Sequence, residues 1–103
     1  MPAKRLRLPA EAFKDMRGFA KRSSPFFIVR LRPNQLSRSR FAVVVSVKVD
    51  RTAAGRNRLK RRVREWLRLQ PGSGSQDIIV TLLPAAGKLA RKEFLQEINR
   101  ILP

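Results

Sequence analysis

The stretch TAAGRNRLKRRVREWLRL, from Thr52 to Leu69, has the periodicity of an amphipathic helix. Thr52 is a suitable N-cap, because its hydroxyl can accept a hydrogen bond from a backbone N–H of the first turn. Apolar residues then recur at i, i+4, i+7 and i+8, which predicts one stripe that packs against a core. These residues are Leu59, Val63, Trp66 and Leu67. The sequence therefore predicts a helix that begins after Thr52 and ends near Gln70.

The rest of this predicted helix is strongly basic. Arg56, Lys60 and Arg64 follow one another at i, i+4 and i+8, and the cations that flank them are Arg58, Arg61, Arg62 and Arg68. Like charges at this spacing destabilise an isolated helix by roughly a few tenths of a kcal/mol per pair. A solvated helix face normally mixes both signs, whereas the segment 51–68 has eight basic residues and one acid, Glu65. This pattern indicates a surface that binds a polyanion.

The whole chain has the same bias. Its 103 residues include 24 Lys and Arg against seven Asp and Glu, which gives a net charge of +17. Residues 1–68 contain 20 of the 24 basic groups, so this part of the chain should supply the positive surface that binds a polyanion. Arginine outnumbers lysine by 17 to seven, and its planar guanidinium suits bidentate binding of phosphate and stacking on bases. We expect a nucleic acid as the partner.

Several classes of protein are excluded by composition. Without cysteine or histidine, the chain has no disulfides, no thiolate metal site and no histidine general base. The chain contains no run of about 20 apolar residues, which is the length needed to cross a bilayer. Its basic N-terminal segment is not followed by an apolar run of signal-peptide length. We therefore expect a cytoplasmic protein that folds as one domain over residues 1–103, with no membrane partner.

Other segments of the chain predict a small α+β layer domain. A short helix is expected from Pro9 to Gly18, with Leu8, Ala12, Phe13 and Met16 on one face, and a basic connector follows it. Strands are predicted at Pro25–Leu31, Arg40–Lys48 and Asp77–Leu83, the last buried on both faces. The closing helix starts at Lys88, and its expected stripe is Ala90, Phe94, Ile98, Ile101 and Leu102. The order is helix, strands, helix, strand, helix.

The strand before the basic helix has two different faces. Alternation places one set of side chains toward the core: Phe41, Val43, Val45 and Val47. The opposite set can face a polar ligand: Ala42, Val44, Ser46 and Lys48.

At these residues the chain resembles the bacterial ribonuclease P protein subunit. In that family a strand ending in Val-Ser-Lys-Lys leads into a helix with the pattern Arg-Asn-Arg-x-x-Lys-Arg-x-x-Arg-Glu. The matching residues here are Val45, Ser46, Lys48, Arg56, Asn57, Arg58, Lys60, Arg61, Arg64 and Glu65. The resemblance extends over nearly the whole chain, and includes Arg7, Leu8 and Phe13 in the predicted first helix, SSPFFIVRL, and the strand that starts at Asp77.

The resemblance implies a fold, partners and a division of labour. The fold is a two-layer sandwich with a left-handed βαβ crossover, similar to domain 2 of ribosomal protein S5. The implied partners are the ribonuclease P catalytic RNA and precursor tRNA, and no protein partner is required. The RNA would carry out the Mg²⁺-dependent removal of the 5′ leader, and Mg²⁺ would be held mainly by RNA and substrate. The isolated protein is not expected to cleave.

Two groups of site residues follow from the resemblance. The predicted contacts to the catalytic RNA are Arg56, Asn57, Arg58, Lys60, Arg61 and Arg64. The predicted contacts to the single-stranded leader are Phe13, Phe27, Arg30, Ser46 and Lys48, which combine stacking surfaces with basic and polar groups. Phe13 could equally be a core anchor, Asn57 could be a capping residue, and one of Phe26 and Phe27 must face the helices.

This chain departs from the family pattern at two places. Val47 stands where the family usually has the first lysine of its pair, and Met16 and Arg17 stand where a second aromatic is often found. We therefore expect altered leader binding. Two other classes also fit the charge and size: a structural RNA-binding protein such as a ribosomal protein, and a nonspecific DNA-binding protein, although no DNA-reading motif is present.

Overall fold

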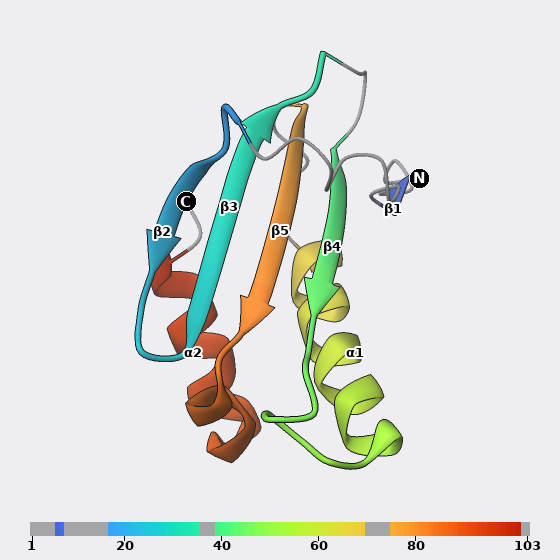
Figure 1. The fold of residues 1–103 in the computed structure, drawn as a ribbon. Helices are drawn as coiled ribbons and strands as arrows, with labels where there is room; N and C mark the ends of the chain where they lie inside the picture. Colours follow the sequence, from blue (N-terminus) through green and yellow to red (C-terminus); the bar gives the residue numbers. More distant parts are fainter. Residues whose placement is uncertain (1–5, 8–16, 36–38, 70–74, 102–103) are drawn as a thin grey trace.

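The computed structural model describes residues 6–7, 17–35, 39–69 and 75–101. Its elements occur in the order β1 (Leu6–Arg7), β2 (Ala20–Ser23), β3 (Phe27–Pro33), β4 (Arg40–Val44), α1 (Ala53–Leu69), β5 (Gln76–Leu82), the short 3₁₀ helix η2 (Pro84–Lys88) and α2 (Arg91–Ile101). The predicted α+β layer architecture is confirmed (Figure 1). Most of the first predicted helix, including Leu8, Pro9 and Phe13, lies outside the described residues.

The strands form one sheet in the order β1-β4-β5-β3-β2, with β5 at its centre. β5 pairs antiparallel with β3, from Phe27 opposite Leu82 to Pro33 opposite Gln76. On its other side β5 pairs parallel with β4, and both α1 and α2 cover one face of this sheet (Figure 1). The two-layer arrangement leaves a second sheet face turned away from the helices, which we call the opposite face.

The crossover from β4 through α1 to β5 is left-handed, as the family resemblance implied. In Figure 1 the chain runs down β4, returns upward along α1 behind the sheet and enters β5 to the left of β4. Parallel strands joined by a crossover are right-handed in about 98% of cases, so this connection is an exception. It places α1 directly against the strand that precedes it.

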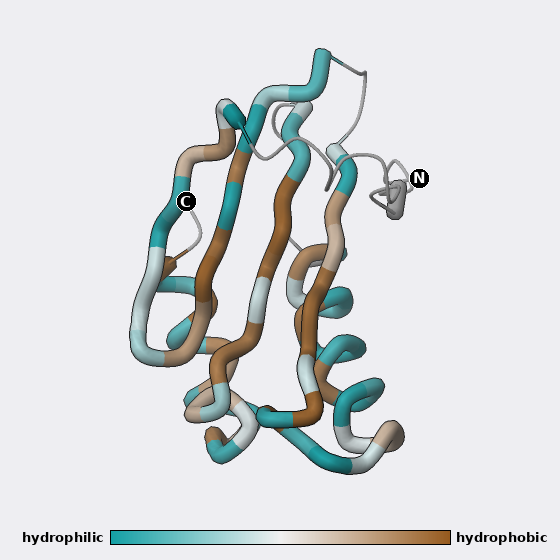
Figure 2. The backbone as a smooth tube through the Cα atoms, in the orientation of Figure 1, coloured by the Kyte–Doolittle hydropathy of each residue, from teal (hydrophilic) through white to brown (hydrophobic). Residues whose placement is uncertain are grey.

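A single layer of apolar side chains joins the helices to the sheet. Alternation on the strands turns Phe27, Val29 and Val80 inward, and all three are fully buried. The predicted α1 stripe is confirmed, since Leu59, Val63, Trp66 and Leu67 are at most 8% exposed. From α2 the buried residues are Phe94, Ile98 and Ile101. Burial of each such side chain contributes about 1.5–3 kcal/mol to the free energy of unfolding. Figure 2 shows the hydrophobic residues concentrated along the inner strands of the sheet.

Three parts of the sheet differ from expectation. β4 ends at Val44, and the chain then turns, so Val47 is 62% exposed instead of facing the core. Residues 20–23, expected as a basic connector, form the edge strand β2, which is held by antiparallel pairing with β3 and not by apolar burial. Arg7, expected in a helix, lies in β1 and pairs with Phe41.

Candidate nucleic-acid interface

The start of α1 is fixed by a small polar cluster. Thr52 is the N-cap, because its Oγ1 accepts a hydrogen bond from the N–H of Gly55 at 3.0 Å. The carboxylate of Asp50 accepts two further bonds, from the N–H and the hydroxyl of Thr52, both at 2.8 Å. A Cβ at position 55 would collide with this carboxylate, so any larger residue there would displace the Asp50 side chain from this position. The bonds from Thr52, with weaker attraction from Arg58 and Arg56, lower the pKa of Asp50.

The outward face of α1 carries a basic ridge, which we define as Asn57, Arg58, Arg61, Arg64 and Arg68. All five residues are exposed and lie on the side of the helix opposite the buried stripe. No hydrogen bond or ion pair within the described part of the chain engages these four arginines, so their guanidinium groups face solvent. The ridge can therefore reach the phosphates of an external partner.

Two residues predicted to bind RNA lie at the edge of this ridge. Arg56 and Lys60 are half-buried. The Nη1 of Arg56 donates to the carbonyl oxygens of Asp50 and Arg51, both at 3.0 Å, so this side chain also secures the turn before α1. Contacts with the catalytic RNA stay a prediction for the six helix residues named in the sequence analysis, which are Arg56, Asn57, Arg58, Lys60, Arg61 and Arg64.

Arg62 does not belong to the ridge. Its Nη1 points to the carbonyl oxygen of Leu89, 3.5 Å away, and its guanidinium carbon lies 5.6 Å from the centre of the Phe94 ring. Burial lowers the pKa of Arg62, and repulsion from Arg58 and Arg91 lowers it further. Arg62 therefore occupies the junction between α1 and α2.

The opposite face of the sheet is organised around a buried acid. Asp77, at the start of β5, is 1% exposed and accepts two hydrogen bonds from Arg40, at 2.9 Å from Nε and 2.8 Å from Nη2. Asn34 Nδ2 donates to the same carboxylate at 3.0 Å, and Arg32 Nη2 lies 3.8 Å away. From the sequence, Asp77 was placed at the start of a predicted strand and was given no role in a binding site. A lone acid in an otherwise apolar buried strand was the signal available.

The arginines around Asp77 determine its ionisation. Desolvation raises the pKa of the Asp77 carboxyl, but hydrogen bonds from Arg40 and Asn34 and the charges of Arg40 and Arg32 outweigh it, so the pKa is lowered. The hydrogen bond to Asp77 in turn raises the pKa of Arg40. This cluster is consequently a charged ion pair at neutral pH, with its basic groups fixed in place.

A second contact on this face involves an arginine and an aromatic ring. The guanidinium carbon of Arg32 lies 4.1 Å from the centre of the Phe19 ring, and its Nη1 donates to the carbonyl oxygen of Arg17 at 3.1 Å. Phe19 also packs with Ala42 against the buried Ile79. Phe19 and Arg32 were not predicted as site residues, yet they form an aromatic and cationic surface on the same face of the sheet as Arg30, a predicted leader contact.

The predicted leader-binding residues are only partly brought together. Arg30 is half-buried on the opposite face and is paired in register with Lys21 of β2. Ser46 and Lys48 are exposed in the turn after β4, where Ser46 O accepts the N–H of Val49 at 3.0 Å. No described contact joins Arg30 to Ser46 or Lys48. Phe13 lies outside the described residues.

The prediction that the Phe27 ring contacts the leader is wrong, because the ring is buried. Its side chain is 0% exposed and faces the helices, where its ring meets Phe94 edge-on at 5.1 Å. The alternation of the strand requires one of Phe26 and Phe27 to face inward, and this residue is Phe27. Phe26 is half-buried and also packs against the core.

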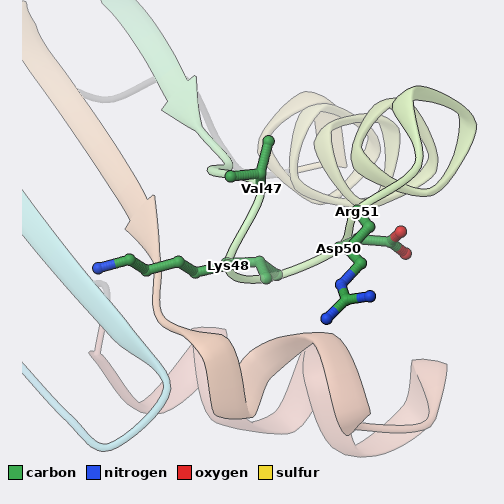
Figure 3. Close-up of a pocket in the computed structure, with 5 residues that line it drawn as sticks. Val47, Lys48, Asp50 and Arg51 are labelled. Carbon is green, nitrogen blue, oxygen red and sulfur yellow. The ribbon is translucent and has the colours of Figure 1, made fainter.

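The turn between β4 and α1 lines a shallow hollow. Its walls are Val47, Lys48, Val49, Asp50 and Arg51. In Figure 3 Lys48 extends away from α1 in the direction of β5, whereas the carboxylate of Asp50 points toward α1. A Cβ at Gly87 would come within 2.8 Å of the carbonyl oxygen of Val49, so a small residue in η2 is needed for this packing. Lys48 is thus presented at the carboxyl end of the parallel strand pair.

Metal-binding clusters and membrane-spanning helices are both absent from the described part of the chain. It contains no group of three or more acidic, cysteine or histidine side chains placed to hold a metal ion. None of its helices is both long enough and apolar enough to span a bilayer. The basic ridge and the opposite face are the candidate binding surfaces that contain residues predicted from the sequence.

Comparison with known proteins shows the family to which this chain belongs. The model of the family described as Ribonuclease P matches residues 2–103. The chain belongs to the ribonuclease P protein family. The ribonuclease P protein component of Chromobacterium violaceum is 43% identical over 82 residues, which cover 79% of this chain and 68% of the relative. That of Synechococcus elongatus is 36% identical over 96 residues, which cover 84% of this chain and 76% of the relative.

Solved structures of ribonuclease P proteins share the fold. The Staphylococcus aureus protein superposes with a TM-score of 0.83 at 22% identity, covering 96% of this chain and 92% of that one. The Thermotoga maritima protein gives a TM-score of 0.71 at 28% identity, covering 97% and 99%. Membership in the family implies a role in processing the 5′ end of tRNA together with the ribonuclease P RNA.

Proposed function

We propose that this chain is the protein subunit of ribonuclease P and binds the catalytic RNA through the basic ridge of α1. The observation that carries the proposal is the separation of side chains on α1. Its apolar stripe is buried in the core. On the other side of the helix, Arg58, Arg61, Arg64 and Arg68 project outward and have no acidic partner among the described residues. A ridge of this kind stabilises the helix only when phosphates neutralise it.

The 5′ leader of precursor tRNA would bind on the other side of the sheet. Arg30, Ser46 and Lys48 remain candidates there, and Arg32 stacked on Phe19 adds a flat cationic group of the kind that supports unpaired bases. Phe27 is removed from this list by its burial. Loss of leader affinity in Lys48→Ala and Arg30→Ala, with Phe27→Leu unchanged, would support this assignment.

The RNA would carry out the chemistry, with the protein as an assisting subunit in the cytoplasm. Hydrolysis of a phosphodiester by two metal ions needs several carboxylates that converge within a few ångströms. Asp50 is bonded to Thr52, and Asp77 is bonded to Arg40 and Asn34, so neither carboxylate is available for such a centre. Mg²⁺ would then be held mainly by phosphates of the RNA and its substrate.

Reconstitution tests this function directly. The purified chain incubated with precursor tRNA and Mg²⁺ should give no cleavage, and addition of the cognate ribonuclease P RNA should restore cleavage at a Mg²⁺ concentration where the RNA alone is slow. Arg61→Ala/Arg64→Ala should lose this stimulation, whereas Lys21→Ala/Arg22→Ala, which removes the same charge from β2, should keep binding to the catalytic RNA. Cleavage by the protein alone, or no stimulation, would contradict the proposal.

A further inference from the structure

A second group of cations lies at the junction of α1 and α2, which we call the seam. It comprises Arg58 and Arg62 from α1 and Arg91 from α2, together with the single carboxylate of Glu65. The Nη2 of Arg91 lies 3.4 Å from Oε2 of Glu65, in a pair whose side chains are 68% and 42% exposed. Among the described residues this carboxylate pairs with Arg91 alone, so the three guanidinium groups of the seam outnumber its one acid.

Arg62 is the fixed member of this group. Its contacts with Leu89 O and the Phe94 ring hold the guanidinium between the helices, and no carboxylate among the described residues pairs with it. Every buried side-chain nitrogen among the described residues has a hydrogen-bond partner. The nitrogens of Arg62 that have no partner are therefore not buried, and an external group can reach them. A half-buried cation whose charged neighbours repel it favours the approach of an anion.

The first turn of α2 adds to the same imbalance. Arg91 and Lys92 stand at the positive end of the helix dipole, where cations are unfavourable, and Glu93 is the one acid of that turn. The corresponding positions of α1 hold no charge, since that helix begins with Ala53 and Ala54. The placement of cations at the seam therefore costs stability in the isolated protein.

We propose that the seam binds a backbone phosphate of the ribonuclease P RNA, so that the RNA-binding surface continues from the ridge onto the start of α2. The inference rests on the proposed function and extends it beyond the Arg-Asn-Arg helix. The guanidinium groups of Arg58, Arg62 and Arg91 surround the phosphate, and Arg91 exchanges Glu65 for it. Phosphate contacts position an RNA without reading its sequence, so this contact fixes the orientation of the protein.

The position of the seam selects the catalytic RNA over the leader. Arg58 belongs to both the ridge and the seam, so one RNA strand can follow both. The seam also lies on the helical side of the sheet, because α1 and α2 cover the same face (Figure 1). Arg30 and Arg32 alternate along β3 with Val29 and Leu31, which pack in the core, so the two arginines lie on the opposite face. An RNA bound at the seam is therefore separated from the leader by the sheet itself.

Arg91→Ala provides the test, with Arg100→Ala as its matched control. Both arginines are exposed on α2, and each forms an ion pair with a different glutamate. Arg91 pairs with Glu65 at 3.4 Å, and Arg100 pairs with Glu97 at 3.2 Å. Affinity for the cognate ribonuclease P RNA would be measured from 50 to 200 mM salt. Arg91→Ala should weaken binding about fivefold to tenfold and reduce the slope of log K against log salt by about 0.7–0.9. Arg100→Ala should change affinity less than about twofold.

The possible outcomes separate this inference from the proposed function. If Arg61→Ala/Arg64→Ala weakens RNA binding but Arg91→Ala behaves like Arg100→Ala, the seam is not a phosphate site and the ridge stands. If neither the ridge variant nor Arg91→Ala has an effect, the proposed function fails as well. If Arg91→Ala weakens binding of precursor tRNA to the holoenzyme and leaves binding of the catalytic RNA unchanged, the assignment to the catalytic RNA is overturned. Thermal unfolding of each variant checks that it is folded.

Discussion

The ridge on α1 and the opposite face of the sheet are both basic, but their cations are held in different ways. On the ridge, the backbone of α1 fixes the spacing, and the guanidinium groups of Arg61, Arg64 and Arg68 extend into solvent. On the opposite face, Arg40 and Arg32 converge on the buried carboxylate of Asp77. One surface offers adaptable cations on a rigid axis, and the other offers cations that are already oriented.

This difference has a physical consequence for binding. Long free side chains lose conformational entropy when they bind, but they can adjust to a folded RNA of irregular shape. Arginines fixed by a carboxylate lose less entropy, and part of their charge is already compensated. We expect RNA binding at the ridge to depend more strongly on salt. Binding at the opposite face should depend more on whether the ligand fits the fixed positions of its arginines.

The largest effect is expected from Asp77→Ala. Removal of the carboxylate leaves Arg40 without its partner, and breaking a buried ion pair costs about 3–5 kcal/mol. Because the Arg40 side chain is 22% exposed, the loss in the free energy of unfolding should be near 3 kcal/mol. Urea denaturation measures it. Glu97→Gln, which breaks the exposed pair with Arg100, should cost less than about 1 kcal/mol, and equal losses would refute the distinction between the two regions.

The next effect is expected on the ridge and in binding alone. Arg61→Ala/Arg64→Ala should weaken binding of the cognate RNA by about 30-fold, which is about 2 kcal/mol, because two phosphate contacts are lost. Stability should change by less than about 0.5 kcal/mol, since both residues are exposed surface positions. Filter binding and urea denaturation of the same preparations separate the two readouts. A large loss of stability would show that the ridge arginines are structural.

A smaller effect is expected at the N-cap of α1. Thr52→Ala removes the acceptor for the N–H of Gly55 and a hydrogen-bond donor to Asp50, and should reduce the free energy of unfolding by about 1 kcal/mol. Thr52→Ser keeps the hydroxyl and is the control. If the two variants have the same stability, the cap does not determine where the basic helix begins.

The smallest effect is expected from mild acid. The folded-state pKa values of Asp77 and Asp50 are lowered, so the stability that these carboxylates provide is fully present above their unfolded value of about 3.9. This stability is lost only as the pH falls through the lower folded values. Urea denaturation should therefore give the same contribution at pH 7 and pH 5, with a decline below about pH 4. A decline that starts above pH 5 would mean that the Asp77 carboxyl is not held in its charged form.

Elements with strong periodicity could be predicted from the sequence. α1 was expected to begin after Thr52, and its stripe of Leu59, Val63, Trp66 and Leu67 is buried. The last helix and the central strand β5 were also expected near their observed positions. In the two helices one apolar pattern determines both the element and the face that it buries, whereas the continuous apolar run of β5 indicates a strand buried on both faces.

Elements and contacts that depend on pairing could not be predicted. β2 has the sequence AKRS and no apolar alternation, so only its hydrogen bonds to β3 make it a strand. The partner of Asp77, Arg40, lies 37 residues away, and only the parallel register of β4 and β5 brings them together. Phe27 and Phe26 are equally apolar, so the choice of the inward ring depends on the exact register of β3.

The central position of β5 also governs how the chain is completed during synthesis. β3 and β4 each pair with β5 and not with each other, so neither has its principal neighbour until residues 76–82 have been made. Before that point the nascent chain exposes strand edges that could pair with other molecules. Residues 1–75 carry 20 of the 24 basic groups and four acids, and mutual repulsion between such chains opposes aggregation. The charge that suits the finished domain to RNA thereby also protects it while it is incomplete.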